Sequence, residues 1–286
     1  MADPDPATRS DTAARRGTEL MLRVASALVL APLAVGTAIS GNWPFQVFWG
    51  LAAIGVFWEW STLVAGKDHR SVVMVGAAAV GLACVLASND CLWGAAAVIA
   101  LGPMATAPLA PQRRRGWVAG GVPYAAAIGV APIALRSDSG GESGVVAMVF
   151  LFAIVWSTDI AAYFVGRLVG GPKLLPRISP KKTWSGALGG LGAAVLAAIV
   201  LAKLVGLAPF ALAGIAAVLS CLSQAGDLFE SLVKRKFGVK DSSHLIPGHG
   251  GLMDRLDGFV FVAAAAAVVG ILRGGLEAPA QGLLMW

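Results

Sequence analysis

Residues 145–166 read VVAMVFLFAIVWSTDIAAYFVG, an apolar run whose only charged residue is Asp159. A helix needs about 20 mostly apolar residues to cross the roughly 30 Å hydrocarbon core of a bilayer. Lipid offers no hydrogen-bond partners to the backbone of an open strand, so a run of this length predicts a membrane-spanning helix. The run therefore decides the fold class that the rest of the chain has to fit.

The composition of the whole chain agrees with this class. Of its 286 residues, 57% are hydrophobic and 13% are charged, and the mean hydropathy is +0.75. Soluble domains carry about a quarter of their residues as charged side chains, and disordered chains are polar, so both classes are excluded. Three cysteines without metal-ligand spacing argue against a disulfide framework or a zinc site.

The same length criterion finds nine candidate spans, which predict an all-α polytopic integral membrane protein. These spans are residues 20–40, 45–64, 72–88, 92–110, 117–135, 145–166, 187–205, 209–224 and 258–272. The third, eighth and ninth are short, so eight spans are the alternative.

Positive charge is distributed unevenly between the two sides of these spans. All but Arg136, Lys203 and Arg273 of the 22 lysines and arginines fall in the N-terminal arm, at the start of the first span or in loops on one side. Cytoplasmic loops of membrane proteins accumulate positive charge, so we assign this side to the cytoplasm. The net charge of +6 is then explained by the orientation of the protein in the membrane, and we expect no nucleic-acid partner.

The densest charge lies in residues 226–258, GDLFESLVKRKFGVKDSSHLIPGHGGLMDRLDG. Asp227 lies at the end of the eighth predicted span and Asp254 just before the ninth. A carboxylate at a membrane edge is costly unless it is paired or holds a cation. This pattern favours a functional site, and a solvated loop with many ion pairs is the alternative.

Two local patterns in this segment suit phosphate groups. The Gly-rich stretch 247–251 lets backbone N–H groups approach an anion, although a plain turn would also explain it. If the eighth helix continues beyond its apolar part, Ser231, Lys234 and Arg235 share one face. A hydroxyl, an ammonium and a guanidinium on one face are typical of phosphate binding.

Other candidates lie outside this segment. Lys181 and Lys182 follow a Ser-Pro pair, with Pro180 expected near a helix start, and either grip phosphate or only mark the cytoplasmic side. No Gly-x-x-x-x-Gly-Lys-Ser/Thr motif is present, which excludes a P-loop. Asp159 lies inside a predicted span, where an ionisable residue is a functional candidate, with a polar clamp between helices as the alternative. Glu59, between two tryptophans, is a weaker candidate of the same kind.

The order and spacing of these residues resemble the signature of the phosphatidate cytidylyltransferases, also called CDP-diacylglycerol synthases. The match runs from Ser231 through Lys234-Arg235, Lys240-Asp241 and Pro247-Gly248-His249-Gly250-Gly251 to Asp254-Arg255-x-Asp257. The segments 159–167 and 179–184, together with Glu59-Trp60, extend the resemblance over residues 50–262. One departure is Ser185, where the family usually has Glu.

The resemblance implies that CTP and phosphatidic acid give CDP-diacylglycerol and pyrophosphate. It implies Mg²⁺ on Asp227 and Asp254, with room for a second cation such as K⁺. The catalytic residues that it implies are Asp227, Asp254, Lys234, Arg235 and Asp257. The substrate-binding residues are Lys181, Lys182, Ser231, Lys240, Asp241, Gly248, His249, Gly250, Gly251, Arg255 and Asp159.

The implied organisation has three parts. A polar cytoplasmic arm, residues 1–19, precedes N-terminal transmembrane helices, 20–135, and a C-terminal transmembrane catalytic region, 136–286, with its signature at 227–257. The expected place is the inner (plasma) membrane, with the active site in cytoplasmic loops and the adjoining helix ends, among membrane lipids; a homodimer is left open. The alternatives are a related CTP-dependent lipid kinase and an ion-coupled transporter that uses Asp159 and Glu59.

Overall fold

A bundle of long helices makes up the protein. The computed structural model describes residues 26, 28–66, 69–137, 142–243, 245–246 and 250–286. Within these ranges, eight helices are long and apolar enough to cross a membrane. By element they are α2 (Asn42–Ala65), α3 (Arg70–Ser88), α4 (Leu92–Thr106) with the short η1 (Ala107–Leu109), α5 (Arg115–Arg136) preceded by η2 (Gln112–Arg114), α6 (Ser143–Val169), α7 (Trp184–Val205), α8 (Pro209–Lys236) and α9 (Met253–Gly274).

The first predicted span, 20–40, corresponds to a shorter apolar helix, Leu28–Ser40. The beginning of that span and the N-terminal arm 1–19 lie outside the described residues. The all-α membrane fold is confirmed, and the predicted count of about nine spans is close to the eight full-length helices and this shorter one.

Two predicted helix boundaries are wrong. The eighth helix continues from residue 224 to Lys236, and the ninth begins at Met253 rather than at residue 258. A hydropathy criterion detects only the apolar part of a helix. Residues 225–236 are helical but amphipathic, and they bury only Gly226, Glu230 and Val233 on one face, so the criterion misses them. Asp227 therefore lies inside a helix rather than at its end.

A small sheet interrupts the helices between α6 and α7. Strands β1 (Lys173–Leu175) and β2 (Ser179–Thr183) pair antiparallel, with Lys173 opposite Thr183. Pro180 lies in β2, which corrects the expectation that it begins a helix. Thr183 instead caps α7, since its hydroxyl accepts a hydrogen bond from the Gly186 N–H at 3.1 Å. The hairpin is therefore tied directly to the start of α7.

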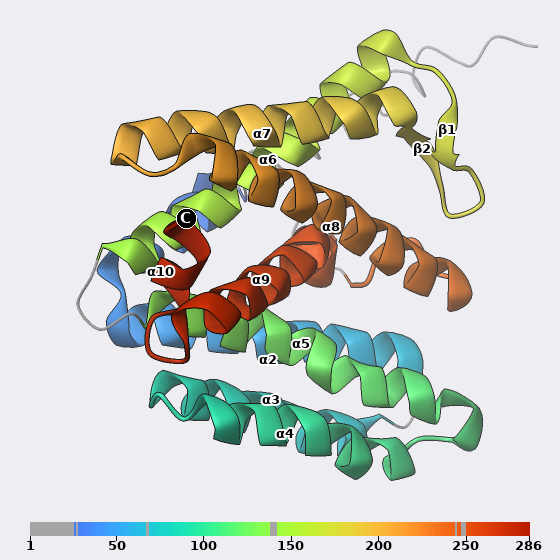
Figure 1. The fold of residues 1–286 in the computed structure, drawn as a ribbon. Coiled ribbons are helices and arrows are strands. Elements are labelled where there is room, and N and C mark those ends of the chain that lie inside the picture. The colour runs from blue at the N-terminus through green and yellow to red at the C-terminus, as the bar shows by residue number, and fades with distance from the viewer. Residues whose placement is uncertain (1–25, 27, 67–68, 138–141, 244, 247–249) are drawn as a thin grey trace, which may run out of the picture.

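Helices α6, α7 and α8 form one layer of the bundle (Figure 1). Glycines let α6 and α7 approach closely, because a Cβ at Gly186 or Gly190 would lie 2.7 Å from a carbonyl oxygen of α6. The Gln224 side chain on α8 donates to the Ala187 carbonyl at 3.2 Å. A buried hydrogen bond of 2.9 Å joins the hydroxyls of Thr158 and Ser220, on α6 and α8.

Helix α9 connects this layer to the N-terminal helices. A Cβ at Gly226 of α8 would overlap the Asp257 carbonyl, and one at Gly258 would lie 2.5 Å from the Ser223 hydroxyl. On its other side, Phe259 stacks on Trp49 of α2 with ring centroids 4.7 Å apart. Helices α8 and α9 are therefore direct neighbours. The short α10 (Pro279–Leu284) packs back onto α9.

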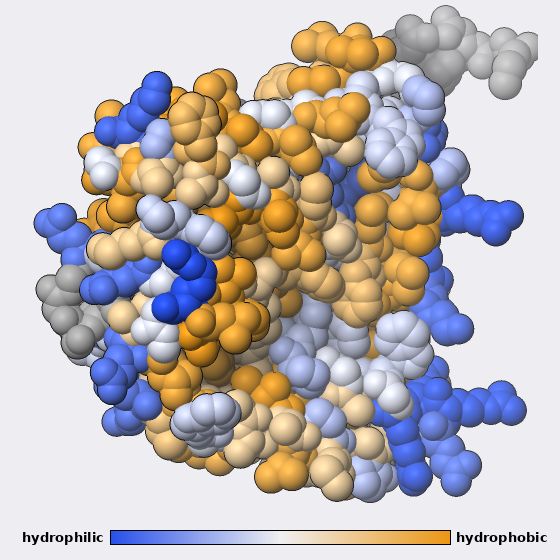
Figure 2. Space-filling model, in the orientation of Figure 1, coloured by the Kyte–Doolittle hydropathy of each residue, from blue (hydrophilic) through white to orange (hydrophobic). Residues whose placement is uncertain are grey.

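The surface has the pattern of a membrane protein. Hydrophobic side chains cover the middle of the molecule, and hydrophilic ones gather at its two ends (Figure 2). The hairpin, the last turns of α8 and the start of α5 all lie at one of these ends (Figure 1). That end carries most of the lysines and arginines that the sequence assigns to a single side.

Candidate active site

A polar cavity of about 600 Å³ opens between α6, the hairpin, α7 and α8. It brings together four residues that the sequence singled out. The charged and polar residues of its lining are Asp159, Tyr163, Arg167, Lys173, Lys181, Lys182, Thr183, Gln224 and Asp227. Segments that are far apart in the sequence thus supply cations and carboxylates to one space.

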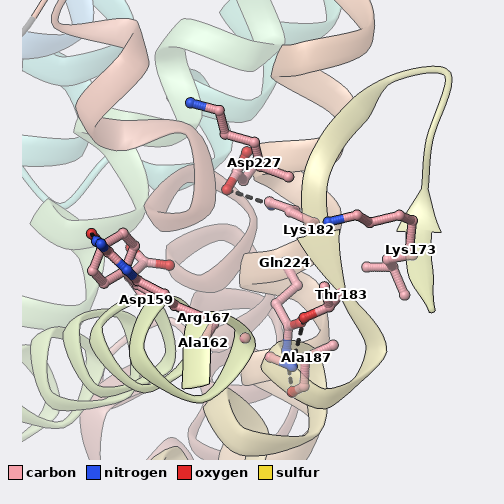
Figure 3. Close-up of a pocket in the computed structure, with 14 residues that line it drawn as sticks. Asp159, Ala162, Arg167, Lys173, Lys182, Thr183, Ala187, Gln224 and Asp227 are labelled. Carbon is pink, nitrogen blue, oxygen red and sulfur yellow. Dashed lines mark hydrogen bonds and ion pairs between the residues drawn. The ribbon is translucent and has the colours of Figure 1, made fainter. Parts of the chain in front are cut away.

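Asp227 faces this cavity from α8. Lys182 reaches from β2 and forms an ion pair with its carboxylate (Figure 3). The Ser231 hydroxyl, one turn further along α8, lies 3.5 Å from Asp227 Oδ1, at the limit of a hydrogen bond. The Asp227 side chain keeps 34% of its surface exposed. Its carboxylate is therefore held by one lysine and remains open to the cavity.

Two more carboxylates lie near Asp227. Asp159 lines the same cavity from α6, and Asp257 on α9 is within electrostatic reach of both. One oxygen of Asp257 accepts the Gly258 N–H at 2.7 Å. The three acids come from three helices, which explains why no spacing in the sequence reveals the group.

An apolar cavity of about 450 Å³ adjoins the polar one. Asp159 lines both, and Arg255 lines only the apolar cavity. The rest of its described lining is mostly apolar, with Leu30, Phe48, Trp49, Phe152, Trp156 and Phe259 among its larger side chains. A polar and an apolar space therefore meet at one carboxylate.

Asp254 is placed differently from Asp227. Its Oδ1 accepts a hydrogen bond of 2.6 Å from Lys234, and its Oδ2 accepts three more. These come from the Ser242 N–H and hydroxyl, both at 3.0 Å, and from the Gly251 N–H at 2.8 Å. Only 5% of the side chain is exposed. The protein itself thus satisfies both oxygens of Asp254, including with a Gly251 donor that we expected to serve phosphate.

Lys234 is likewise committed to protein partners. Its ammonium lies 2.6 Å from Asp254 Oδ1 and 2.6 Å from Glu230 Oε2, and Glu230 is buried. Ser231, Lys234 and Arg235 do lie on a continuous helix, as their spacing predicted. In this structure, however, the lysine neutralises a buried acid pair and does not line either cavity.

The remaining predicted residues lie in or beside the loop between α8 and α9. Arg235 donates to the Val239 carbonyl at 3.3 Å and is exposed, as are Lys240 and Asp241. Gly250 forms a bridge with Ile246. Gly248 and His249 lie outside the described residues. The structure therefore describes none of these residues as part of either cavity.

The sequence missed the role of Glu59 at this site. Its buried carboxylate, on α2, accepts hydrogen bonds from Ser242, Ser243, Leu252 and Met253. A carboxylate between two tryptophans indicated that Glu59 has polar partners, but these partners are more than 180 positions away in the sequence. Only the fold reveals them.

Ser185, the departure from the signature, also has a clear place. Its hydroxyl bonds to the Gly170 carbonyl and lies 3.0 Å from the Thr183 hydroxyl. It fastens the end of α6 to the start of α7 beneath the hairpin. A hydroxyl at this position is therefore a structural contact.

Comparison with known proteins agrees with this picture. The model of the cytidylyltransferase family matches residues 21–272. A phosphatidate cytidylyltransferase of Brucella suis is 40% identical over 269 residues, covering 92% of this chain and 97% of that protein. One of Brucella abortus is 40% identical over 262 residues, covering 89% and 94%. One of Staphylococcus epidermidis is 49% identical over 117 residues, covering 40% and 45%.

The range of the family model includes the residues that line the two cavities, the hairpin and Glu59 with its partners. With a family model over most of its length and full-length relatives at this identity, the chain belongs to the cytidylyltransferase family.

Proposed function

We propose that this protein transfers the cytidylyl group of CTP to phosphatidic acid, giving CDP-diacylglycerol and pyrophosphate for phospholipid synthesis. The observation that carries the proposal is the meeting of the two cavities at Asp159. A phosphatidate molecule has an anionic head and apolar chains, and CTP is a polyanion. One cavity lined by cations and another lined by apolar side chains match these two chemistries side by side.

The reaction needs charge neutralisation more than proton transfer. A phosphate oxygen of phosphatidate attacks the α-phosphorus of CTP, and the bond to the β-phosphate oxygen breaks to release pyrophosphate. The attacking oxygen is already anionic, so no general base is needed, and the barrier is the repulsion between anions. Fixed cations that need no rearrangement lower such a barrier.

Four cations of the polar cavity suit this task. Arg167 comes from α6, Lys173 from β1, and Lys181 and Lys182 from β2. All four line the polar cavity, so the triphosphate would lie among them. We expect Lys182 to exchange Asp227 for a substrate phosphate when CTP binds. Arg255 would hold the lipid phosphate near Asp159.

The family implies Mg²⁺, and the residues of the polar cavity fit a hard cation. Carboxylate oxygens are the ligands that Mg²⁺ prefers, and Asp227 presents an exposed carboxylate with Asp159 and Asp257 nearby. Across the described residues, no group of three acids, histidines or cysteines is close enough to bind a metal alone. This suits Mg²⁺, which keeps several waters and substrate oxygens as ligands. When bound, the ion supplies positive charge to the phosphates.

We assign this ion to Asp227, with Asp254 as its second expected ligand. Asp254 fits less directly, because Lys234, Ser242 and Gly251 occupy its oxygens. Its participation would require Lys234 to release Oδ1. A second cation such as K⁺ belongs to the same proposal, as does a plasma-membrane location with the hairpin end facing the cytoplasm.

The proposal is tested with labelled CTP, phosphatidic acid and Mg²⁺ in detergent micelles containing the purified protein. The expected result is labelled CDP-diacylglycerol and release of pyrophosphate in equal amounts. Release of CDP with a phosphorylated lipid would identify a lipid kinase instead. No turnover of CTP with phosphatidic acid would contradict the proposal.

A further inference from the structure

Glu59 is a buried acid that lines neither cavity, and its hydrogen bonds to described residues go to Ser242, Ser243, Leu252 and Met253. Its Oε1 accepts from the Ser243 hydroxyl at 2.6 Å and from the Leu252 N–H at 2.8 Å. Its Oε2 accepts from the Ser242 hydroxyl at 3.2 Å and from the Met253 N–H at 2.6 Å. The side chain has no exposed surface.

These four donors belong to the two ends of one loop. Ser242 and Ser243 lie within the loop that follows α8, and Leu252 and Met253 lie where it joins α9. A single carboxylate from α2 therefore closes the loop and satisfies N–H groups that the first turn of a helix leaves without partners. Burying a carboxylate is costly, and the hydrogen bonds from these donors offset that cost.

The same loop contains the donors of Asp254. The Ser242 hydroxyl lies 3.2 Å from Glu59 Oε2 and 3.0 Å from Asp254 Oδ2, so one hydroxyl touches both carboxylates. It carries one proton and can donate to only one of them at a time. The Ser242 and Gly251 N–H groups also donate to Asp254. Moving either end of the loop would therefore move the donors of Asp254.

Gly251 shows how closely the loop surrounds Glu59. A Cβ at this position would overlap the Ser242 hydroxyl and lie 2.8 Å from both Glu59 oxygens. No side chain larger than hydrogen fits without displacing the carboxylate. Gly251, Ser242 and Glu59 are thus packed as one unit.

We infer that Glu59 is a positioning residue of the cytidylyl transfer reaction, which holds Ser242 and Ser243 against the start of α9 and, through Ser242 and Gly251, positions the carboxylate of Asp254. The inference rests on the proposed function. Glu59 touches neither cavity, so it acts through Asp254 and the start of α9. Its loss should therefore lower turnover while leaving the binding of both substrates nearly unchanged.

The test is Glu59→Gln in the full-length protein in micelles. Gln has the same shape as Glu, but its NH₂ group is a donor and cannot accept hydrogen bonds from the N–H and O–H groups that face it. One end of the loop should therefore move away from position 59. We expect kcat to fall about 100-fold, as for a displaced catalytic group, with KM for CTP and phosphatidic acid changed less than about threefold. The control is Gly102→Ala, whose Cβ would lie 2.7 Å from Val122, which strains the α4–α5 contact far from the loop.

A second measurement does not depend on activity. Hydrogen exchange of the peptide covering residues 250–256 should be faster in Glu59→Gln than in the wild type, because the Leu252 and Met253 amides lose their acceptor. If the wild type makes no CDP-diacylglycerol, the proposed function fails, and exchange still tests the contact. Unchanged exchange in the variant overturns the inference.

Kinetics separate positioning from general destabilisation. If kcat in Glu59→Gln is unchanged, or if Gly102→Ala loses as much kcat for the same loss of melting temperature, the inference is overturned.

Should Glu59→Gln not fold, Ser243→Ala removes a single donor from Oε1 and should give a smaller fall in kcat with unchanged KM. Full kcat in Ser243→Ala with unchanged exchange would then overturn it. The double variant of Ser243→Ala with Ser242→Ala should lose less kcat than the product of the two single effects, because both act on one carboxylate.

Discussion

Asp227 and Asp254 lie on neighbouring helices and were predicted to share one role, but their surroundings differ. Asp227 is 34% exposed, faces the polar cavity and has one strong partner, Lys182. Asp254 is 5% exposed and lies within hydrogen-bond distance of four donor groups on Lys234, Ser242 and Gly251, of which the Ser242 hydroxyl is shared with Glu59. One carboxylate can exchange its partner at little cost, and the other is part of the structure of the loop.

The difference shows how one signature combines two kinds of residue. An exposed ion pair contributes little to stability, so Lys182 and Asp227 are free to separate when substrate and metal arrive. A buried carboxylate that loses its donors leaves several polar groups without partners, each at a cost of about 1–3 kcal/mol. Residues of the first kind should affect catalysis alone, and residues of the second kind should affect catalysis and stability together.

The largest expected effect is that of Asp227→Asn on turnover. Removing the carboxylate that we assign to the metal, and that balances the cavity cations, should lower kcat at least about 1,000-fold. The melting temperature in micelles should stay within about 2 °C of the wild type, since an exposed pair contributes at most about 1 kcal/mol. Activity near that of the wild type, with the same Mg²⁺ requirement, would remove Asp227 from the metal site.

Asp254→Asn should instead reduce stability as well as activity. It leaves Lys234 beside Glu230 without its second acid and gives the N–H groups of Ser242 and Gly251 a weaker acceptor. Breaking a buried pair in this way costs about 3–5 kcal/mol. Thermal unfolding followed by tryptophan fluorescence measures this cost against Asp227→Asn. Equal melting temperatures for the two variants would contradict the distinction drawn here.

How much of this the sequence predicted depends on how local the cause is. The span 145–166 was close to α6 because a long apolar run is a local property. The end of α8 was missed because residues 225–236 are amphipathic, and hydropathy stops where the apolar run stops. The β1–β2 hairpin was missed because Ser-Pro-Lys-Lys resembles a helix start.

The site residues follow the same rule. Lys182 and Asp227 were identified by their residue types and by resemblance, and the structure places both in one cavity. Glu59 had no assigned role because only the packing of α2 against α9 brings its partners to it. These partners are Ser242, Ser243, Leu252 and Met253. Glu230 was given no role for a similar reason: its importance comes from burial beside Lys234.

Gly251→Ala tests the loop without changing any charge. The added Cβ would displace Ser242 and the Glu59 carboxylate, so we expect a loss of about 1–3 kcal/mol of stability. Gly192→Ala is the matched control, because a Cβ there meets nothing within 4 Å and lies within α7. The control should be neutral or slightly stabilising. Equal melting temperatures for the two variants would show that the loop can move aside.

Replacing Lys181 and Lys182 together by Gln should have a smaller effect, confined to substrate binding. Each hydrogen bond from a charged group to phosphate contributes about 1.5–3 kcal/mol, and solvent in the open cavity reduces this contribution. We expect KM for CTP to rise about tenfold or more, with a similar amount of folded protein. Lys203→Gln, at the other end of α7, is the control and should behave as the wild type. An unchanged KM for both substrates would leave the two lysines as markers of topology.

The smallest effect concerns the apolar cavity, where Ala34→Leu would fill part of the space assigned to the lipid. The residue lines the cavity between the helix Leu28–Ser40 and α2, and the larger side chain leaves less room for acyl chains. One methylene of lost burial is worth about 0.8 kcal/mol, so KM for long-chain phosphatidic acid should rise a few-fold. KM for CTP should not change, because among the described lining residues the polar cavity shares only Asp159 with this one. Ala193→Leu is the control, since it adds the same side chain to an apolar strip of α7 away from both cavities. Equal kinetics for the two variants with long-chain phosphatidic acid would separate the apolar cavity from lipid binding.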